Sequence, residues 1–116
     1  MINVSILRYE DQGIHGFEVK GHAYFAKAGE DIVCAGVSAV TVGTVNSVES
    51  LTGIVMDSKM KNGFLNASLP AVVQPKAYEQ VQLLLASMVV MLQSIEMSYG
   101  KYIQIHDVII SKKEVD

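Results

Sequence analysis

The segment from Ile32 to Thr52 most constrains the fold, because it is long, nearly uncharged and clearly bounded. Asp31, a good N-cap residue, precedes it, and Gly53, the usual residue at a helix C-terminus, follows it. Its valines and threonines also suit strands, but about twenty residues far exceed an ordinary strand. We therefore predict a helix over 32–52. Its apolar residues lie on nearly every side of the first half, which places it centrally or against a second subunit.

Two short strands are predicted before this helix. Apolar and polar residues alternate over 2–6 and again over 17–20, the pattern of strands with one buried face, and a turn at 10–13 separates them. Residues 21–31 then form a loop that leads into the helix.

A hairpin is predicted after the helix. Segments 54–61 and 64–69 flank Asn62 and Gly63, a residue pair that is the strongest short-range signal for a tight hairpin turn. We expect both segments to be strands.

A second helix and a last strand complete the pattern. Pro75 is well placed for the first turn of a helix, whose apolar stripe continues to Ile95 and which Gly100 ends. The last strand is expected over about 102–110, and the polar tail 111–116 is expected to fray.

The predicted fold is α+β, a single domain over residues 1–116 in the order ββαββαβ, with one sheet packed with two long helices. Of the 116 residues 50% are hydrophobic and 18% charged, so the chain is globular. The net charge of −3 argues against direct nucleic-acid binding. We find no apolar run long enough for a bilayer, no signal-peptide pattern and only one cysteine, so we expect a cytoplasmic protein with no membrane partner.

Cys34, the only cysteine, and His22 form a candidate catalytic dyad. A thiol becomes a strong nucleophile as the thiolate, and a nearby imidazole is the usual group that removes its proton. Cys34 falls in the first turn of the predicted helix, where free backbone N–H groups and the macrodipole favour a negative sulfur. The alternative is that Cys34 is an ordinary core residue, since free cysteines are commonly buried.

Asp31 and Ser38 are supporting candidates. Asp31 caps the helix or orients His22, while its negative charge opposes thiolate formation. Ser38 lies one turn after Cys34, where its hydroxyl either bonds within the site or bonds back to its own helix. Backbone N–H groups near Cys34, left free at a helix start, are candidate donors to the oxyanion.

The loop between the two dyad residues has its own features. Gly21 and Gly29 bracket it and are candidate hinges that let it reshape around a substrate. Tyr24 and Phe25 either line an apolar pocket or anchor the loop, and the sequence leaves both interpretations open.

No metal or cofactor site is predicted. Cys34 and the histidines at 15, 22 and 106 lack the paired spacing of zinc ligands, and no glycine-rich phosphate-binding motif occurs. We expect His15 and His106 to be surface or packing residues of strands.

The motif Gly21-His22-Ala23, followed by Gly29 and by the run Asp31-Ile32-Val33-Cys34-Ala35-Gly36-Val37-Ser38-Ala39, resembles the signature of the ribosomal-processing cysteine proteases, the Prp family. The likeness extends over the whole chain in length, in element order and in a second helix that carries Leu92-Gln93-Ser94-Ile95-Glu96.

This resemblance implies a cytoplasmic, homodimeric endopeptidase that needs no cofactor. Its expected partner is a ribosomal protein precursor, the bacterial-type twenty-seventh protein of the large subunit, whose N-terminal extension it removes. By the same resemblance, the residue matching Cys34 is the nucleophile, the residue matching His22 is the base, and the loop matching 21–31 moves when substrate binds.

Two other functions stay open from the residues alone. One is a non-catalytic module that binds or chaperones a ribosomal protein. The other is a thiol hydrolase for a small molecule, since the same dyad serves many acyl-transfer reactions.

Overall fold

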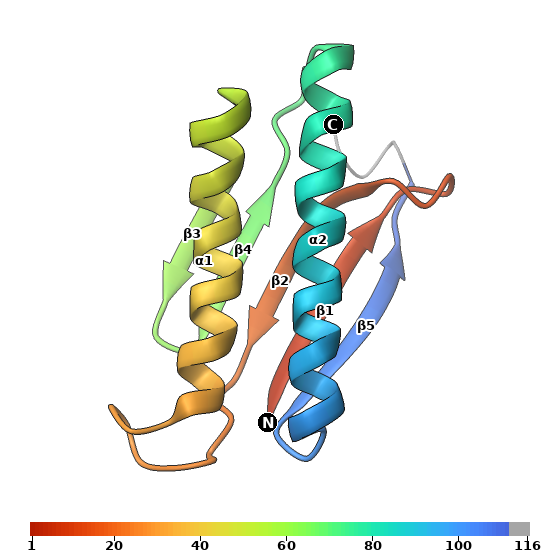
Figure 1. Cartoon of the computed structure of the whole chain (residues 1–116). Helices are drawn as coiled ribbons and strands as arrows, with labels where there is room; N and C mark the ends of the chain where they lie inside the picture. Colours follow the sequence, from red (N-terminus) through yellow and green to blue (C-terminus); the bar gives the residue numbers. More distant parts are fainter. Residues whose placement is uncertain (112–116) are drawn as a thin grey trace.

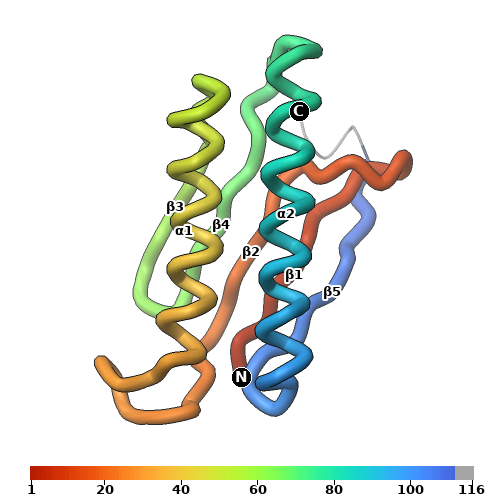
Figure 2. Tube along the Cα trace, viewed as in Figure 1, coloured from red at the N-terminus to blue at the C-terminus, as the bar shows by residue number. Residues whose placement is uncertain are grey.

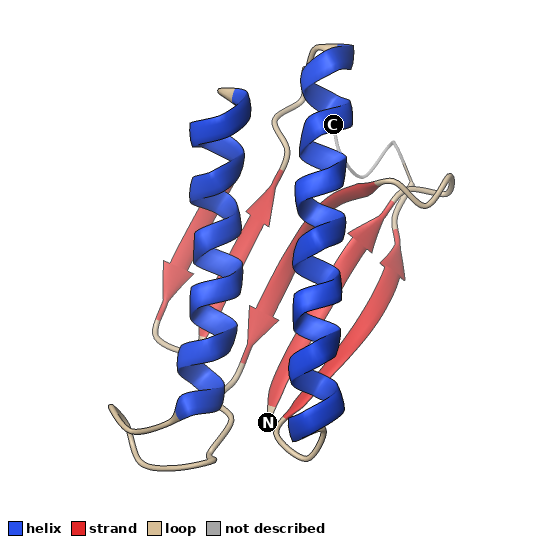
Figure 3. Cartoon of the chain, in the orientation of Figure 1, coloured by secondary structure: helices blue, strands red, loops and turns tan. Residues whose placement is uncertain are grey.

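The protein folds into two layers, a sheet and a pair of helices that lie side by side across one of its faces (Figures 1 and 3). The computed structural model describes residues 1–111, so most of the predicted polar tail lies outside the described residues. The α+β class and the order ββαββαβ are confirmed. The elements are β1 (Ile2–Arg8), β2 (Ile14–Lys20), α1 (Ile32–Thr52), β3 (Asp57–Lys61), β4 (Phe64–Ser68), α2 (Pro75–Tyr99) and β5 (Ile103–Ile109).

The five strands form one sheet in the order β3-β4-β2-β1-β5. All neighbours are antiparallel except β1 and β5, which pair in parallel from Ile2 opposite Ile103 to Arg8 opposite Ile109. The β2–β4 pairing ends with Lys20 opposite Phe64, which brings the end of β2 beside the β3–β4 turn. The tube in Figure 2 shows this turn and the loop 21–31 at the same end of the molecule.

Local signals set both ends of α1 where the sequence predicts them. The Asp31 carboxylate accepts hydrogen bonds from the backbone N–H groups of Val33 and Cys34, and Gly53 ends the helix with φ 78°. The expected central position is wrong, since α1 lies on one face of the sheet beside α2. Its side away from the sheet is open, and Ile32 is 57% exposed.

The core lies between the sheet and the two helices. Ile6 of β1 and Phe17 of β2 project into it, and α2 supplies a stripe that includes Leu85, Met88 and Leu92, all five fully buried. Burying a side chain of this size stabilises the fold by about 1.5–3 kcal/mol. This packing fixes both helices, and therefore the start of α1, relative to the strand ends.

Two strands begin three residues away from the predicted start. β3 begins at Asp57 rather than at residue 54, because its partner β4 ends opposite it at Ser68. The next N–H, that of Leu69, donates to the His15 carbonyl instead. β2 begins earlier than predicted, at Ile14, where the backbone bonds both to β1 and to the side-chain amide of Gln82. Such long-range partners leave no local sequence signal.

Both helices are long and apolar enough, by length and composition, to cross a membrane. The sequence prediction of no spanning stretch rested on uninterrupted apolar runs and stays a prediction, because the core helix of a folded domain passes the same test. In the structure α1 and α2 each pack one side against the sheet, and 28% of each apolar stretch is buried.

Candidate active site

The loop 21–31 returns the chain to the first turn of α1, so that its start lies against Cys34. The backbone N–H of Ala23 donates a hydrogen bond to Cys34 Sγ at 3.4 Å. The first residue of the loop is tied to the hairpin, since the Gly21 N–H donates to the Gly63 carbonyl at 2.9 Å. A half-buried Cys34 side chain at a cavity edge, touched by an N–H donor, is unlike an inert core cysteine.

The Asp31 carboxylate accepts hydrogen bonds from the backbone of both α1 and the loop 21–31. Its Oδ1 accepts the N–H groups of Val33 and Cys34, each at 3.0 Å. Its Oδ2 accepts those of Phe25 at 2.9 Å and Ala26 at 3.3 Å. Desolvation raises the pKa of this carboxyl, but the four backbone donors outweigh it and hold the pKa below its ordinary value. The predicted capping role is confirmed, and the carboxylate bonds to the loop backbone rather than to His22.

The same capping overturns one expectation. The sequence predicts free N–H groups near Cys34 as oxyanion donors, yet those of Val33 and Cys34 are taken by Asp31 Oδ1. The Ala35 N–H donates to the Asp31 carbonyl at 3.0 Å, as the helix requires. The N–H groups of Val33, Cys34 and Ala35 are thus all taken, and at this helix start within residues 1–111 only that of Ile32 has no hydrogen-bond partner.

The His22 ring lies between the loop and the hairpin turn. Its ring centroid is 5.8 Å from that of Tyr24, with the two planes at 58°. On its other side is Gly63, where an added Cβ would come 2.6 Å from His22 Nε2. Neither ring nitrogen has a hydrogen-bond partner among residues 1–111, so the ring is positioned by packing.

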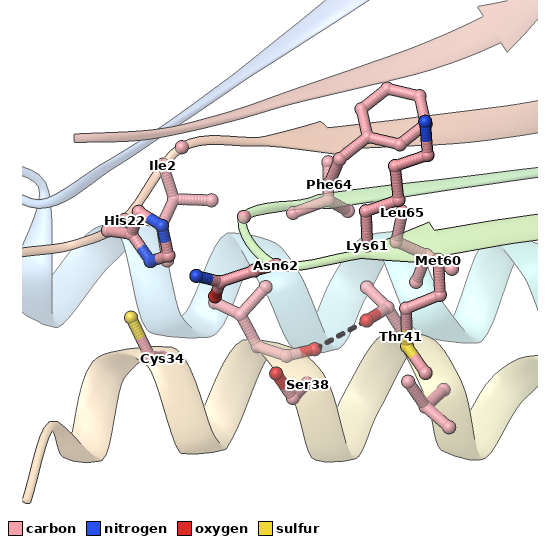
Figure 4. A pocket seen from close by; sticks show the side chains of 15 residues that line it. Ile2, His22, Cys34, Ser38, Thr41, Met60, Lys61, Asn62, Phe64 and Leu65 are labelled. Atoms are coloured by element: carbon pink, nitrogen blue, oxygen red, sulfur yellow. Dashed lines mark hydrogen bonds between the residues drawn. The ribbon is translucent and has the colours of Figure 1, made fainter. Parts of the chain in front are cut away.

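One cavity extends from this point between α1 and the hairpin, and we call it the hairpin pocket. It has a volume of about 290 Å³, and Figure 4 shows its lining from close by. Beyond His22 and Cys34 its walls are mainly apolar. They include Val37 and Val42 of α1, Met60 of β3 and Leu65 of β4.

A second cavity of about 570 Å³ lies under the loop, and we call it the loop pocket. Tyr24, Ala26, Ala28 and Gly29 of the loop line it, together with Asp31 and Ala35. Small side chains and backbone thus form most of this wall.

Four residues line both cavities: His22, Cys34, Ser38 and Asn62. The predicted dyad therefore lies where two pockets meet, as Figure 4 shows for its hairpin side. Asn62 is not among the site residues that the sequence predicts, where it is only a turn signal. No local pattern reveals that β4 pairs with β2 and carries the turn to His22.

Ser38 lines both pockets with an exposed side chain. In the described part of the chain its hydroxyl makes no hydrogen bond, whereas Thr41 on the same helix donates to the Val37 carbonyl at 2.8 Å. Of the two alternatives, a bond back to its own helix is therefore wrong. The hydroxyl is available to a bound molecule.

Tyr24 and Phe25 divide the two proposed roles between them. Tyr24 lines the loop pocket, is 75% exposed and has φ 56°, a left-handed conformation unusual for an aromatic residue. Phe25 anchors the loop instead, with its ring edge-on to Tyr99 and Tyr102 at centroid distances of 5.7 and 5.2 Å. The strained backbone of Tyr24 is thus held by the contact of its ring with His22 and by the anchored ring of Phe25.

The hinge candidates Gly21 and Gly29 both have positive φ, 93° and 86°. A Cβ at Gly21 would collide with the Met1 carbonyl oxygen. These conformations favour glycine, and the hinge role itself stays a prediction.

The remaining histidines lie away from the site. His15 is buried in β2 with its Nδ1 2.8 Å from the Tyr9 hydroxyl, and burial lowers its pKa. His106 is exposed on β5. Across residues 1–111 no group of three or more histidine, cysteine or acidic side chains could hold a metal ion.

A thiol at a helix start, an imidazole on the same cavity edge and two pockets that meet there define a cysteine hydrolase of the two-layer α+β kind. Residues 1–104 match the family model described as cysteine protease Prp, and the chain belongs to this family of cysteine proteases. Membership excludes a purely non-catalytic binding module.

Curated relatives extend the match over nearly the whole chain. The ribosomal processing cysteine protease Prp of Bacillus subtilis is 43% identical over 101 residues, which cover 85% of this chain and 90% of that protein. Its counterpart from Staphylococcus aureus is 33% identical over 106 residues, covering 91% and 98%.

Solved structures confirm the fold. The crystal structure of an essential ribosomal processing protease Prp from Staphylococcus aureus, in complex with a covalently linked product peptide, superposes with a TM-score of 0.84. It is 32% identical and the match covers 93% of this chain and 100% of that one. The same protease in complex with a substrate peptide gives a TM-score of 0.78 at 31% identity, with the same coverage.

Proposed function

We propose that this protease removes the N-terminal extension of a ribosomal protein precursor, the bacterial-type twenty-seventh protein of the large subunit, through a dyad of Cys34 and His22. The observation that carries the proposal is the meeting of two pockets at these two side chains. A peptide that crosses both pockets presents an internal bond to the sulfur, as an endopeptidase requires. The names of the relatives, which are ribosomal processing proteases, support the substrate class.

The chemistry begins with proton transfer from Cys34 to His22. The ring has no hydrogen-bond partner among residues 1–111, and general-base contacts are often loose before substrate binds. Binding of the peptide across both pockets brings the imidazole of His22 to the thiol of Cys34. The Ala23 N–H, which already donates to Sγ, stabilises negative charge on the sulfur.

The thiolate then attacks the scissile carbonyl carbon and forms a C–S bond, while the carbonyl electrons move onto oxygen. When this tetrahedral intermediate collapses, the C–N bond breaks and His22 gives its proton to the leaving amine. Water, deprotonated by His22, next attacks the thioester. The C–S bond breaks, the acid product leaves and Cys34 regains its proton.

The test is intact-mass spectrometry of the ribosomal protein precursor after incubation with the wild type, Cys34→Ala and His22→Ala. We expect one N-terminal loss with the wild type, none with Cys34→Ala, and a rate reduced by at least about 10²-fold with His22→Ala. A precursor left uncut by folded wild-type protein refutes the proposed substrate. Cutting by Cys34→Ala refutes the proposed nucleophile.

We also propose that the enzyme works as a homodimer in the cytoplasm. Support for the dimer comes from apolar side chains on the helices that the single chain leaves exposed, among them Leu51 at 69% and Leu83 at 73%. Large apolar side chains left exposed on a helix layer are available to a subunit interface. Light scattering coupled to size exclusion tests the dimer, and a monomer at micromolar concentration refutes it. Cell fractionation tests the compartment.

A further inference from the structure

The tetrahedral intermediate of the proposed reaction needs a hydrogen-bond donor for its oxyanion, and the N–H groups of Val33, Cys34 and Ala35, which lie closest along the chain to the sulfur, are already taken. Val33 and Cys34 donate their N–H groups to Asp31 Oδ1, each at 3.0 Å. The Ala23 N–H is directed at Cys34 Sγ. Without another donor, the charge that develops on the substrate oxygen would be only weakly stabilised in this cavity.

The Ser38 hydroxyl and the Asn62 side chain both line the two pockets without a hydrogen-bond partner among residues 1–111, and Asn62 has the chemistry and the position of an oxyanion donor. Its side-chain amide carries two N–H donors, and within residues 1–111 that amide has no hydrogen-bond partner. Figure 4 shows it extending from the hairpin turn toward the space between His22 and Cys34. It also lines both pockets, so a peptide bond held over the sulfur lies within its reach.

The backbone that carries this amide is rigidly placed. Asn62 and Gly63 form the two-residue turn between Lys61 and Phe64, which are paired with each other across the hairpin. Phe64 is also paired with Lys20 of β2, and the Gly63 carbonyl accepts the Gly21 N–H at 2.9 Å. A turn held in this way keeps the amide at the cavity edge, which lowers the reorganisation that an oxyanion donor needs during the reaction.

We propose that the Asn62 side-chain amide is the oxyanion donor of this enzyme. As the sulfur attacks, the C–S bond forms, the carbonyl electrons move to oxygen, and Asn62 Nδ2–H donates to that oxygen. On collapse the carbonyl re-forms, the amide nitrogen leaves with the proton from His22, and Asn62 releases the oxygen. The assignment rests on the proposed role of Cys34 as the nucleophile.

Two reactions of the same thiol separate this role from others. Acylation of Cys34 by p-nitrophenyl acetate passes through a tetrahedral oxyanion, whereas alkylation by iodoacetamide does not. Both depend on the sulfur and on His22, and neither needs the ribosomal precursor. A residue that only stabilises the oxyanion affects the first reaction and spares the second.

The variants are Asn62→Ala, which removes the donor, and Asn62→Asp, which keeps the shape but replaces N–H with oxygen. Asn66→Ala is the matched control, because its amide lies in the same hairpin but faces Glu18, 3.4 Å away. Asn62 does not have a positive φ, so neither substitution strains the turn.

For Asn62→Ala we expect the acylation rate and the kcat for peptide cleavage to fall by about 10²-fold, with KM and the alkylation rate unchanged. Both rates should fall further in Asn62→Asp, and both should equal the wild-type rates in Asn66→Ala. An unchanged acylation rate overturns the assignment, and so does a parallel fall in alkylation, which would mean that Asn62 positions His22. A rise in KM alone overturns it in favour of substrate binding.

Failure of the proposed substrate is recognised separately. Suppose that the wild type leaves the precursor intact while p-nitrophenyl acetate still acylates the enzyme and Asn62→Ala slows this acylation. In that case the substrate proposal fails and the oxyanion assignment stands. If Cys34→Ala is acylated as fast as the wild type, the nucleophile and the assignment fail together.

Discussion

Gly63 offers a direct test of how the His22 ring is positioned. Its φ of 73° costs an alanine about 1–2 kcal/mol, of which the less flexible unfolded chain returns up to about 1 kcal/mol. The more specific effect is steric, since an added Cβ would lie 2.6 Å from His22 Nε2. To restore an ordinary contact of 3.4 Å the ring must move by about 0.8 Å. A displacement near 1 Å at a reacting group can cost about 10²-fold in rate.

Gly53 is the matched control, because its φ is 78° and a Cβ added there would meet nothing within 4 Å. We expect Gly63→Ala and Gly53→Ala to lower the Tm alike, by roughly 4 °C per kcal/mol lost. Only Gly63→Ala should lower kcat/KM, by about 10²-fold. Thermal unfolding followed by calorimetry and cleavage followed by mass spectrometry measure both effects. Full activity in Gly63→Ala, or an equal loss of activity in Gly53→Ala, refutes the idea that Gly63 is needed to position the His22 ring.

Three further predictions concern the loop and the core. Because the pKa of Asp31 is lowered in the fold, its contribution to stability is present above the ordinary value of 3.8 and is lost as the pH falls through the folded value. Asp31→Asn should therefore lower the Tm at pH 7, but its Tm should fall less than that of the wild type on acidification. Parallel profiles of Tm against pH would contradict this. Phe25→Ala removes two ring contacts worth about 0.5–1.5 kcal/mol each, so trypsin should cut the loop faster at Lys27, while Phe25→Leu should give an intermediate rate. Leu85→Ala should lower the free energy of unfolding by about 2–5 kcal/mol in denaturant titrations, and Leu83→Ala, at a position 73% exposed, should change the stability of the monomer little; equal losses would show that the packing is wrong.

The accuracy of the sequence predictions follows the range of the interactions involved. The ends of α1 are predictable because the capping by Asp31 and the turn at Gly53 are local. The β3–β4 turn is predictable for the same reason. Its place against His22 is not, because it depends on the pairing of β4 with β2, which are far apart in the chain.

The site itself shows the same division. Cys34 and His22 are distinctive residue types in a recognisable spacing, so the sequence makes them candidates for the dyad. Asn62 is a common turn residue whose importance depends on its neighbours in space. The expectation of free N–H groups at Cys34 is wrong because it treats Asp31 as the cap of the helix and still counts the first N–H groups of that helix as free. The residue that caps the helix so well also consumes the donors that an uncapped helix would offer.

The parallel pairing of β1 with β5 affects the timing of activity during synthesis. Ile2 of β1 pairs with Ile103 of β5, which is made much later, and the loop 21–31 is anchored by Phe25 on Tyr99 and Tyr102. A ribosome releases Cys34 and His22 long before it makes these partners, and domains generally complete their folding as units. The nascent chain therefore carries both residues of the proposed dyad before its sheet is complete, and we expect proteolytic activity only once the last strand has emerged.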